Sequence, residues 1–465
     1  MDAPQPVDLI VEGTVVTSDA ARRVVADGAV AVDGGTIVAV GDRRRVTGAY
    51  DATATIGGAH AVVTPGMIDV HQHLTGDRLL HSSIPDDLPP GEALTAWALP
   101  AHAAHDGDDD ELSATLALAE ALTNGVTTVV EAGTVAHPDR VAAAFTATGA
   151  RGTLGTWGWD IGDGAHTSSA DEVLARQRAT VEELACVDRV DGWVTLVGHD
   201  LMSDELAAGA ATLARRLGTR LTFHCSPSPA DPAAYLTRTG RRPLVHLDEI
   251  GVLGPHALVA HAVHIDDDEI AALVATDTAV ASCPWAYLRL GQGVTGAGRH
   301  VELIARGVRL GLGGDSENAG DAIDMLRAAA LFAGLAKDTA ADPTVCGAHD
   351  AFALATIGGA AAIGRDHDLG SIEVGKRADL VVHDTRAPQW VPRSDDVVLQ
   401  LVWATDGRTV SDVVVDGRPV VRDRRLVGLD LVAVADEART RRAALLERAG
   451  LAGRVAISPP GPGAS

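Results

Sequence analysis

Apolar and polar positions follow two different periods along the chain, and the change falls near residue 65. Before it, residues 7–64 alternate at every second position between glycine turns, as in the segment 29–32 ahead of Gly34 and Gly35. A period of two with such turns is typical of short antiparallel strands. A similar alternation returns late in the chain, at 378–382, 410–415 and 419–421. We therefore predict a small β-sandwich domain assembled from both chain ends, residues 1–64 and 371–430.

Between these pieces, residues 65–370 alternate short apolar runs with stretches of helical period. The stretch 109–122, for example, has acidic residues in its first turn and Gly125 beyond its end, which are helix start and stop signals. Eight apolar runs are predicted as strands, at 66–70, 126–131, 152–156, 194–197, 220–223, 257–260, 279–282 and 309–313. Eight strands alternating with helices predict an α/β fold, a closed (β/α)8 barrel of the TIM type. Residues 431–465 are predicted to form a C-terminal helix and a flexible tail.

An open, doubly wound sheet is the competing fold. No G-x-G-x-x-G motif follows a predicted strand. This disfavours both that fold and a nucleotide-binding function.

Composition narrows the classes of function. Hydrophobic residues make up 46% of the 465 residues but aromatic ones only 3%, so the core must be built from Ala, Val, Leu and Ile. With a net charge of −25 the chain has no basic stripe to neutralise nucleic-acid phosphates or to bind an anionic membrane, and we expect neither partner. The four cysteines lie far apart without a C-x-x-C pair, as in a reduced cytoplasmic protein. We expect no signal peptide at residues 1–11 and no membrane span.

The strongest local motif lies where the first barrel strand is predicted to end. The apolar run 66–70 leads into His71-Gln72-His73. Residues two apart on a strand point to the same side, so both imidazoles should face inward together. Neutral imidazole is a good ligand for zinc and its first-row neighbours. By itself the motif also fits two ordinary hydrogen-bonded histidines.

Other predicted strands carry histidine or aspartate at or just beyond their C-terminal ends. These residues are His199, His224, His261 and Asp315. The carboxyl ends of barrel strands form the rim where barrel enzymes keep their catalytic groups. Their repetition at four strand ends, together with the two histidines on the first strand, favours a metal site over isolated structural histidines.

With these motifs the chain resembles the amidohydrolase superfamily over nearly its whole length. The matching segments are 65–69 before His71, 125–128, 198–200 with 203–206, 258–264, Cys283-Pro284, 312–316 and 370–380. The resemblance is greatest to the branch of mononuclear deaminases and triazine hydrolases, which includes the cytosine, guanine and methylthioadenosine/S-adenosylhomocysteine deaminases.

The resemblance implies a role for each of these residues. His71, His73 and His224 would be the imidazole ligands of one divalent metal, and Asp315 the fourth protein ligand. Asp315 would also take a proton from a metal-activated water that attacks a non-peptide C–N bond of a small cyclic amidine, amide or aminated heterocycle. His261 would polarise the group under attack, and His199 would contact the substrate.

Lysine usage bears on the number of metal ions. Superfamily members with two metals usually bridge them with a carboxylated lysine on a barrel strand. The two lysines, Lys337 and Lys376, lie outside the predicted strands, and we therefore expect one metal. Three histidines and an aspartate with an open position suit zinc, which we expect first, and also iron or manganese.

Further substrate contacts are predicted around this centre. Ser226 shares the inward side of its strand with His224, and Glu317 follows Asp315 by two residues. Trp97 and Trp285 are candidates for the floor of a site for an aromatic substrate, and core or interface packing is the equal alternative for both.

One position departs from the family pattern. Deaminases of the family usually carry a glutamate three residues after the third metal-binding histidine, where it protonates a ring nitrogen, but this chain has Pro227. Tyr287 stands where the family often has an asparagine after Cys-Pro. Either the acid comes from elsewhere, with Asp200 and Glu317 as candidates, or the reaction is not ring deamination.

Two alternatives to a deaminase follow. One is hydrolysis of another bond on the same centre, such as C–Cl, a lactam or an ester. The other is a non-catalytic barrel scaffold, which is disfavoured because a degenerate copy should lose its metal ligands first and all four persist. We predict a cytoplasmic enzyme with a small-molecule substrate that forms a homodimer or a higher homo-oligomer, as relatives commonly do.

Overall fold

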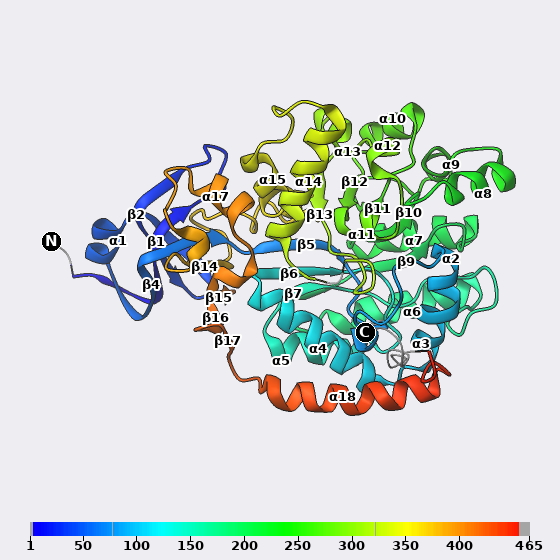
Figure 1. Cartoon of the computed structure of the whole chain (residues 1–465), viewed down its shortest axis with the longest axis horizontal. Helices are drawn as coiled ribbons and strands as arrows, with labels where there is room; N and C mark the ends of the chain where they lie inside the picture. The colour runs from blue at the N-terminus through cyan, green and yellow to red at the C-terminus, as the bar shows by residue number, and fades with distance from the viewer. Residues whose placement is uncertain (1–2, 77, 321, 455–465) are drawn as a thin grey trace, which may run out of the picture.

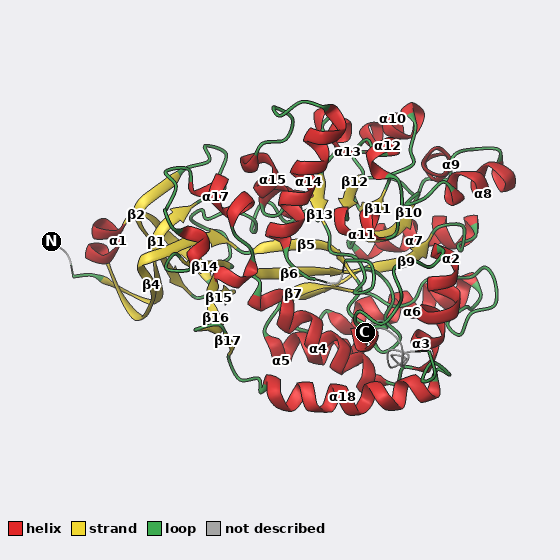
Figure 2. Cartoon of the chain, in the orientation of Figure 1, coloured by secondary structure: helices red, strands yellow, loops and turns green. Residues whose placement is uncertain are grey.

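The computed structural model describes residues 3–76, 78–320 and 322–454. Parallel strands surrounded by helices form the larger part of the molecule. A sheet built from both chain ends lies beside them, at the left of Figure 1 and Figure 2.

The parallel strands of the described chain fall into two hydrogen-bonded sheets. One has the order β5-β6-β7-β8 and the other the order β13-β12-β11-β10-β9. The strands are β5 (Met67–Gln72), β6 (Val126–Glu131), β7 (Arg151–Leu154), β8 (Val190–Gly192), β9 (Val194–Gly198), β10 (Leu221–Cys225), β11 (Ala257–His261), β12 (Ala279–Ser282) and β13 (Leu310–Leu312). Strands such as β6 and β10 are buried along their whole length, as expected where helices cover a parallel sheet.

Every strand predicted between residues 65 and 370 has a counterpart here, with ends shifted by at most two residues. The short strand β8 is additional and precedes β9 by one residue, Trp193. The N–H of Trp193 donates to the carbonyl of Leu154 on β7, so this residue continues the first sheet toward β9.

Helices connect these strands and begin at the expected caps. The side chain of Ser203 accepts a hydrogen bond at the start of α7, and Asp106 and Asp109 form a capping box at the start of α4. The helical elements of this part are η1 (Arg78–Leu80), α2 (Pro90–Ala93), η2 (Leu94–Ala98), α3 (Leu99–Ala104), α4 (Gly107–Thr123), α5 (Pro138–Thr148), α6 (Ala170–Leu184), α7 (Asp204–Leu217), α8 (Ala230–Thr239), α9 (Pro243–Glu249), α10 (Asp267–Thr276), α11 (Pro284–Arg289), α12 (Val294–Ala297), α13 (His300–Ala305), α14 (Met325–Ala340), α15 (Ala348–Leu354) and α16 (Ile357–Ala362).

The two chain ends share one mixed sheet. Within the described residues its order is β17-β16-β15-β14-β4-β1-β2-β3, and the β14–β4 pair joins the C-terminal strands to the N-terminal ones. Successive residues of β1 face opposite sides, with Leu9 and Val11 in one apolar cluster and Ile10 in another that also contains Val46 of α1. The elements are β1 (Gln5–Val16), β2 (Val24–Asp33), β3 (Thr36–Asp42), α1 (Arg43–Ala49), β4 (Tyr50–Pro65), β14 (Leu380–Asp384), η3 (Pro388–Trp390), α17 (Val397–Ala404), η4 (Gly407–Thr409), β15 (Val410–Val415), β16 (Arg418–Arg422) and β17 (Arg425–Leu426).

The last described helix is α18 (Leu431–Arg448), which lies along the outside of the molecule below α4 and α5 in Figure 1. Arg441 of α18 pairs with buried Asp109 of α4 at 2.7 Å, and Arg448 contacts the same carboxylate. The predicted C-terminal helix is therefore present, whereas the predicted flexible tail after residue 454 lies outside the described residues.

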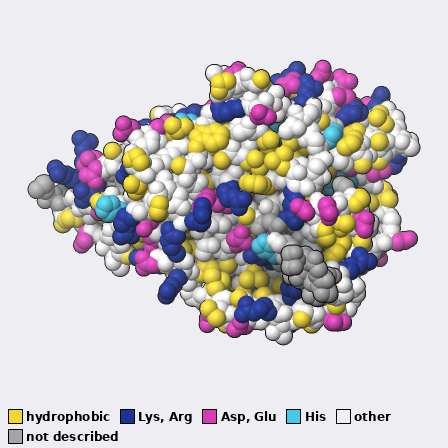
Figure 3. Space-filling view, in the orientation of Figure 1, with side chains coloured by type: hydrophobic (Ala, Val, Ile, Leu, Met, Phe, Trp, Pro, Cys, Tyr) yellow, Lys and Arg dark blue, Asp and Glu magenta, His cyan; other side chains and the backbone are white. Residues whose placement is uncertain are grey.

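The largest apolar cluster joins the parallel strands to their helices and consists mainly of Ala, Val and Leu, with few aromatic residues such as Phe145 and Phe223. Positive and negative side chains are interspersed over the face seen in Figure 3. Among the described helices, none is both long and apolar enough to cross a membrane.

Candidate metal centre

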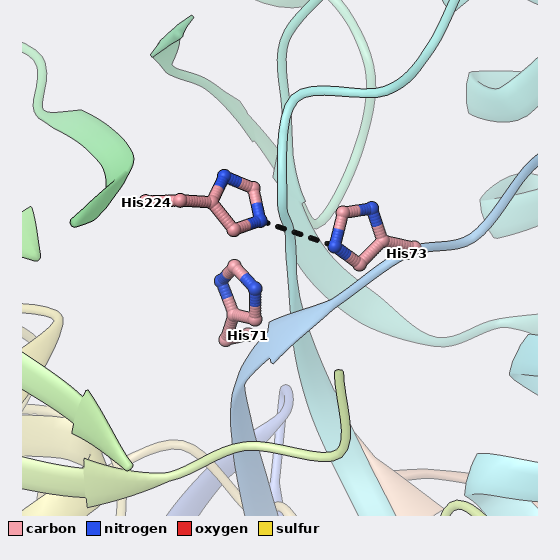
Figure 4. Close-up of side chains that lie close together, drawn as sticks. All are labelled: His71, His73 and His224. Carbon is pink, nitrogen blue, oxygen red and sulfur yellow. Dashed lines mark hydrogen bonds between the residues drawn. The ribbon is translucent and has the colours of Figure 1, made fainter. Parts of the chain in front are cut away.

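The C-terminal ends of the parallel strands bring the predicted ligands together. His71 lies on β5, His73 follows that strand directly, and His224 lies on β10. In Figure 4 the three rings turn toward one another, with His224 Nε2 at 3.2 Å from His73 Nε2. One ring nitrogen of each histidine lies within 4.8 Å of the other two, which is close enough for all three to share a cation.

Asp315, just beyond β13, completes the cluster. Its Oδ1 lies 3.4 Å from His73 Nε2 and 3.9 Å from His71 Nε2. Its Oδ2 lies 4.0 Å from Nδ1 of His261, the last residue of β11. All four predicted ligands and the predicted polarising histidine therefore surround one point.

Backbone contacts fix the two strands that carry His71 and Asp315. The N–H of Asp315 donates to the carbonyl of His71 at 2.8 Å. Buried Asp69 accepts the backbone N–H groups of His71 and Gly314, each at 3.0 Å. Position 313 must be glycine, because a Cβ there would lie 2.8 Å from the Cβ of His71. The local sequence thus permits the close approach that the cluster needs.

Outer partners decide which ring nitrogen of each histidine faces the cluster. His224 Nδ1 donates to the carbonyl of Val197 at 2.7 Å. His73 Nδ1 lies 3.0 Å from the hydroxyl of Thr134, which donates to buried Glu131 at 3.1 Å and so must accept from His73. In both rings the proton sits on Nδ1, and Nε2 presents a lone pair toward the other ligands, as in most metal-binding histidines.

His71 tests whether a metal fits this cluster. It is 1% exposed, and neither of its ring nitrogens has a hydrogen-bond partner among the described residues. Burial holds the pKa values of His71 and His224 well below the usual histidine value, so both rings are neutral. Burial would raise the pKa of Asp315, but the imidazoles around it, His73 foremost and then His261 and His71, hold that pKa well below its usual value. Neutral imidazoles beside an ionised carboxylate form a donor set that suits a divalent cation.

Comparison with known proteins agrees with this geometry. The model of the amidohydrolase family matches residues 62–420. The chain belongs to the amidohydrolase family. It is similar to the 5-methylthioadenosine/S-adenosylhomocysteine deaminase of Syntrophobacter fumaroxidans, with 32% identity over 93% of this chain and 96% of that protein.

Two solved structures are similar to this amidohydrolase over nearly its whole length. An adenosine deaminase from Xanthomonas campestris with bound zinc has 30% identity, covers 96% of this chain and 100% of its own, and gives a TM-score of 0.90. The atrazine chlorohydrolase of Arthrobacter aurescens, complexed with zinc, has 24% identity, covers 93% of this chain and 100% of its own, and gives a TM-score of 0.84. The second likeness shows the fold alone. The chain is a metal-dependent hydrolase that acts on C–N bonds other than peptide bonds.

In this amidohydrolase His199 lies beside the histidine cluster. Its ring stacks on that of His224 with centroids 5.3 Å apart, and its Nδ1 is 2.9 Å from Asp231 Oδ2. Burial would lower the pKa of His199, but the Asp231 carboxylate outweighs it and raises that pKa. The structure therefore brings this predicted substrate contact to the centre together with a carboxylate partner.

Two hydrogen bonds to its backbone carbonyl hold His261 in place. Its carbonyl accepts a hydrogen bond from His300 Nε2 at 2.7 Å and one from the Tyr287 hydroxyl at 3.4 Å. Tyr287 is thus buried under His261 and also accepts the backbone N–H of Cys283 at 2.8 Å. Burial lowers the pKa of His261 to about 4, so its ring is neutral at neutral pH.

Of the other predicted substrate contacts, Ser226 is buried next to β10, and its backbone N–H donates to Asp231 at 2.7 Å. Buried Glu317 forms an ion pair with Arg78 at 2.7 Å. Asp200, the other candidate acid, pairs with Arg238 at 2.8 Å. Both candidate carboxylates are therefore engaged by arginine.

The two predicted aromatic floor residues pack against other side chains. Trp97 packs with Leu80 and Leu446 in an apolar cluster between the segment after β5 and α18. Trp285 lies on α11, where the guanidinium of Arg327 sits 4.7 Å from its ring centroid. Both rings pack against side chains of neighbouring helices, and this packing accounts for their positions.

Three residues near the centre escaped prediction from the sequence. Asp231 on α8 and Thr134 in a loop each bond a histidine ring, and Glu131 on β6 acts through Thr134, so no spacing within the sequence connects them to the histidines. The one available signal was Asp231 in the first turn after the Ser-Pro-Ser-Pro segment that replaces the family glutamate.

Proposed function

We propose that this chain binds one metal ion per molecule, zinc first, through His71, His73, His224 and Asp315. The observation that carries the proposal is the buried His71 ring, both of whose nitrogens lack a partner within the described chain, beside the ionised Asp315. The relative from Xanthomonas campestris that was solved with zinc supports the choice of metal. Such a metal supplies water acidic enough to deprotonate at neutral pH.

The protein residues would do the rest of the chemistry. Asp315 takes a proton from the attacking water and passes it toward the leaving nitrogen, a general acid–base role. The neutral His261, whose Nδ1 lies 4.0 Å from Asp315 Oδ2, polarises the group under attack. His199 and Ser226 contact the substrate. Glu317, Trp97 and Trp285 stay predicted substrate contacts, and the structure gives each a protein partner, in Arg78, Leu446 and Arg327 respectively.

We propose that the substrate is an amino-substituted heterocycle of the adenine nucleoside class and that the reaction releases ammonia. The name of the Syntrophobacter relative, a 5-methylthioadenosine/S-adenosylhomocysteine deaminase 32% identical to this chain, supports this class. The Xanthomonas relative named as an adenosine deaminase supports it too.

Ammonia release from zinc-loaded protein tests the proposal. The panel contains 5′-methylthioadenosine, S-adenosylhomocysteine and adenosine, with guanine, cytosine, a pterin and an aminotriazine as further substrates. His224→Ala is the blank. Ammonia that appears with an adenine nucleoside and disappears in the blank is the expected result. If protein shown to hold about one zinc per chain releases none, the deaminase proposal fails.

Pro227 favours one second candidate, hydrolysis of a different bond on the same centre. Proline carries no proton, so position 227 offers no acid for a ring nitrogen. Displacement of chloride, or cleavage of a lactam or ester, depends less on an acid that protonates a ring nitrogen. Chloride release from a chlorotriazine, or acid release from a lactam or ester, by protein that releases no ammonia would establish this candidate.

We also propose that the two parallel sheets are the two arcs of one closed eight-stranded barrel, over residues 65–370. The bridge between Gln72 and Asp315 joins β5 to the end of β13, and Trp193 joins β8 to β9, which supports closure. Residues 1–64 and 371–430 would form a separate sandwich domain, with 431–465 as the C-terminal segment. The turn between β2 and β3 supports a folded-over sheet, because a Cβ on Gly35 would lie 2.9 Å from the carbonyl of Asp416, between β15 and β16.

The predicted homo-oligomer and cytoplasmic location stay predictions. The four cysteines are unpaired in the described chain, which supports a reducing compartment. Light scattering of the purified chain would give its oligomeric state.

A further inference from the structure

One face of α8 holds the loop that follows β9. Asp231, Tyr235 and Arg238 are four and three residues apart, so they lie on one side of this helix. The Tyr235 hydroxyl donates to the carbonyl of His199 at 3.1 Å, and Arg238 Nε donates to Asp200 at 2.8 Å. Asp231 binds the ring of His199. The helix thus forms hydrogen bonds with both the backbone carbonyl and the ring of His199.

The contact with Asp231 determines which nitrogen of His199 is available. Asp231 is 8% exposed, and the same oxygen, Oδ2, accepts the backbone N–H of Ser226 at 2.7 Å and faces His199 Nδ1 at 2.9 Å. A carboxylate that accepts hydrogen bonds requires a proton on Nδ1. His199 Nε2 has no hydrogen-bond partner among the described residues. It is therefore the ring atom that His199 can offer to a substrate.

Among the described residues, the other carboxylates proposed as acids for this centre have different partners. Position 227, where the family resemblance places a glutamate, is proline. Asp200 and Glu317 are both bound by arginine, through Arg238 and Arg78. Asp231 lies four residues beyond Pro227 and instead points at a histidine.

We propose that Asp231 is a positioning residue, which fixes His199 in the orientation and tautomer that present Nε2 to the substrate. Asp231 itself does not touch the substrate. The inference rests on the proposed hydrolase function of the same centre and extends that function to Asp231 on α8.

A double-mutant cycle tests the coupling in zinc-loaded protein with 5′-methylthioadenosine as the probe. Asp231→Asn should lower kcat/KM by about 10- to 100-fold, the effect expected for loss of a charged hydrogen bond, and mainly through kcat. In a His199→Ala background the same change should have almost no further effect. Asp231→Glu should recover part of the loss. The matched control is Asp204→Asn, which alters a carboxylate that also contacts α8, through Arg238, but does not touch His199.

Equal losses from Asp231→Asn with and without His199 would overturn the proposal, because they would show a purely structural role for Asp231.

A readout without substrate separates this inference from the proposed function. In protein labelled with 15N at histidine, the ring signals of His199, identified by their loss in His199→Ala, should show a proton bound to Nδ1. Asp231→Asn should change this pattern, and Asp204→Asn should not. An unchanged pattern in Asp231→Asn would overturn the positioning role. The expected change in a protein that turns over no panel substrate would reject the proposed reaction while leaving the positioning role supported.

Discussion

At the scale of single residues, the nitrogen that carries the proton on each imidazole ring determines which nitrogen is available to bind a metal. Val197 and Thr134 hold the Nδ1 protons of His224 and His73, and this leaves their Nε2 atoms 3.2 Å apart and facing each other within the cluster. Thr134 can do so because Glu131 accepts its hydroxyl proton at 3.1 Å. A chain of Glu131, Thr134 and His73 therefore orients one ligand from outside the cluster.

Replacement of Thr134 by valine should weaken zinc binding by about 10- to 100-fold, the usual effect of losing an outer partner of a ligand histidine. Valine keeps the shape of threonine but cannot accept the Nδ1 proton. Competition for zinc against a chromophoric chelator measures the change. Thr148→Val, at a buried threonine that bonds the Ala144 carbonyl on α5, is the matched control. Equal affinities of Thr134→Val and Thr148→Val would contradict the outer role.

At the scale of elements, the parallel strands end in tight turns that aim side chains at the cluster. After β9, Gly198 has φ of +78° and His199 has φ of +53°, so the chain turns sharply back over His224. A Cβ at position 198 would lie 2.2 Å from the carbonyl of His224. The turn that presents His199 is therefore possible only with glycine before it.

Gly198→Ala should destabilise the protein by about 2–3 kcal/mol, from backbone strain and steric overlap together. It should also lower activity, because it moves His199. Gly218→Ala, at the end of α7, has a comparable φ of +67° but no described atom within 4 Å of its Cβ, and it should cost only about 1 kcal/mol. Urea unfolding of both variants measures the difference, and similar losses for the two would contradict the steric argument.

The sheet of the chain ends contains a pH-sensitive element in β14. His383 is fully buried, with Nδ1 3.1 Å from the Thr409 hydroxyl, and burial lowers its pKa to about 3. An unfolded histidine titrates near pH 6.5. Between these two values the unfolded chain binds the additional proton, so acid favours unfolding.

The free energy of unfolding should accordingly lose up to about 1.4 kcal/mol per pH unit through His383 as the pH falls below about 6.5. His383→Gln lacks this contribution, and other titrating groups are common to both proteins. Urea unfolding from pH 8 to pH 5 should show a difference between the two proteins that is constant above pH 7 and changes below 6.5. Parallel stability curves over the whole range would exclude the effect.

In the whole molecule, a buried ion pair joins the parallel strands to the sheet of the chain ends. Arg151, the first residue of β7, binds Asp379 just before β14 through two bonds of 2.8 and 3.1 Å. Their side chains are 6% and 5% exposed. The two ends of the chain are thus anchored to the strands that carry the ligands.

Asp379→Asn should destabilise the protein by about 3 kcal/mol, because it leaves the buried Arg151 charge with only its longer contact to Asp416, at 3.4 Å. Replacing both residues together, as Arg151→Met with Asp379→Leu, should recover much of the loss. Asp27→Asn breaks the exposed pair with Arg43 and should have a much smaller effect. Thermal unfolding compares the three, and a small loss in Asp379→Asn would contradict the anchoring role.

Much of this architecture was determined locally. The strands of the central part were predictable because each is a short apolar run between turn signals, and a buried parallel strand needs little more. His71, His73, His224, His261 and Asp315 were identifiable because each stands at or just after such a run, and the ends of parallel strands meet at one edge.

Tertiary structure decided which residues act on these groups. Asp231 and Thr134 bond the rings of His199 and His73 from other elements, and Glu131 bonds Thr134. These hydrogen bonds depend on how the strands and helices pack together. The packing of Trp97 and Trp285 was likewise decided by the fold. An aromatic ring packs against whichever surface the fold brings to it, and sequence does not identify that surface. Short-range pattern therefore determined the strands and the histidine and aspartate residues at their ends, and the long-range fold determined the protons and the orientation of these residues.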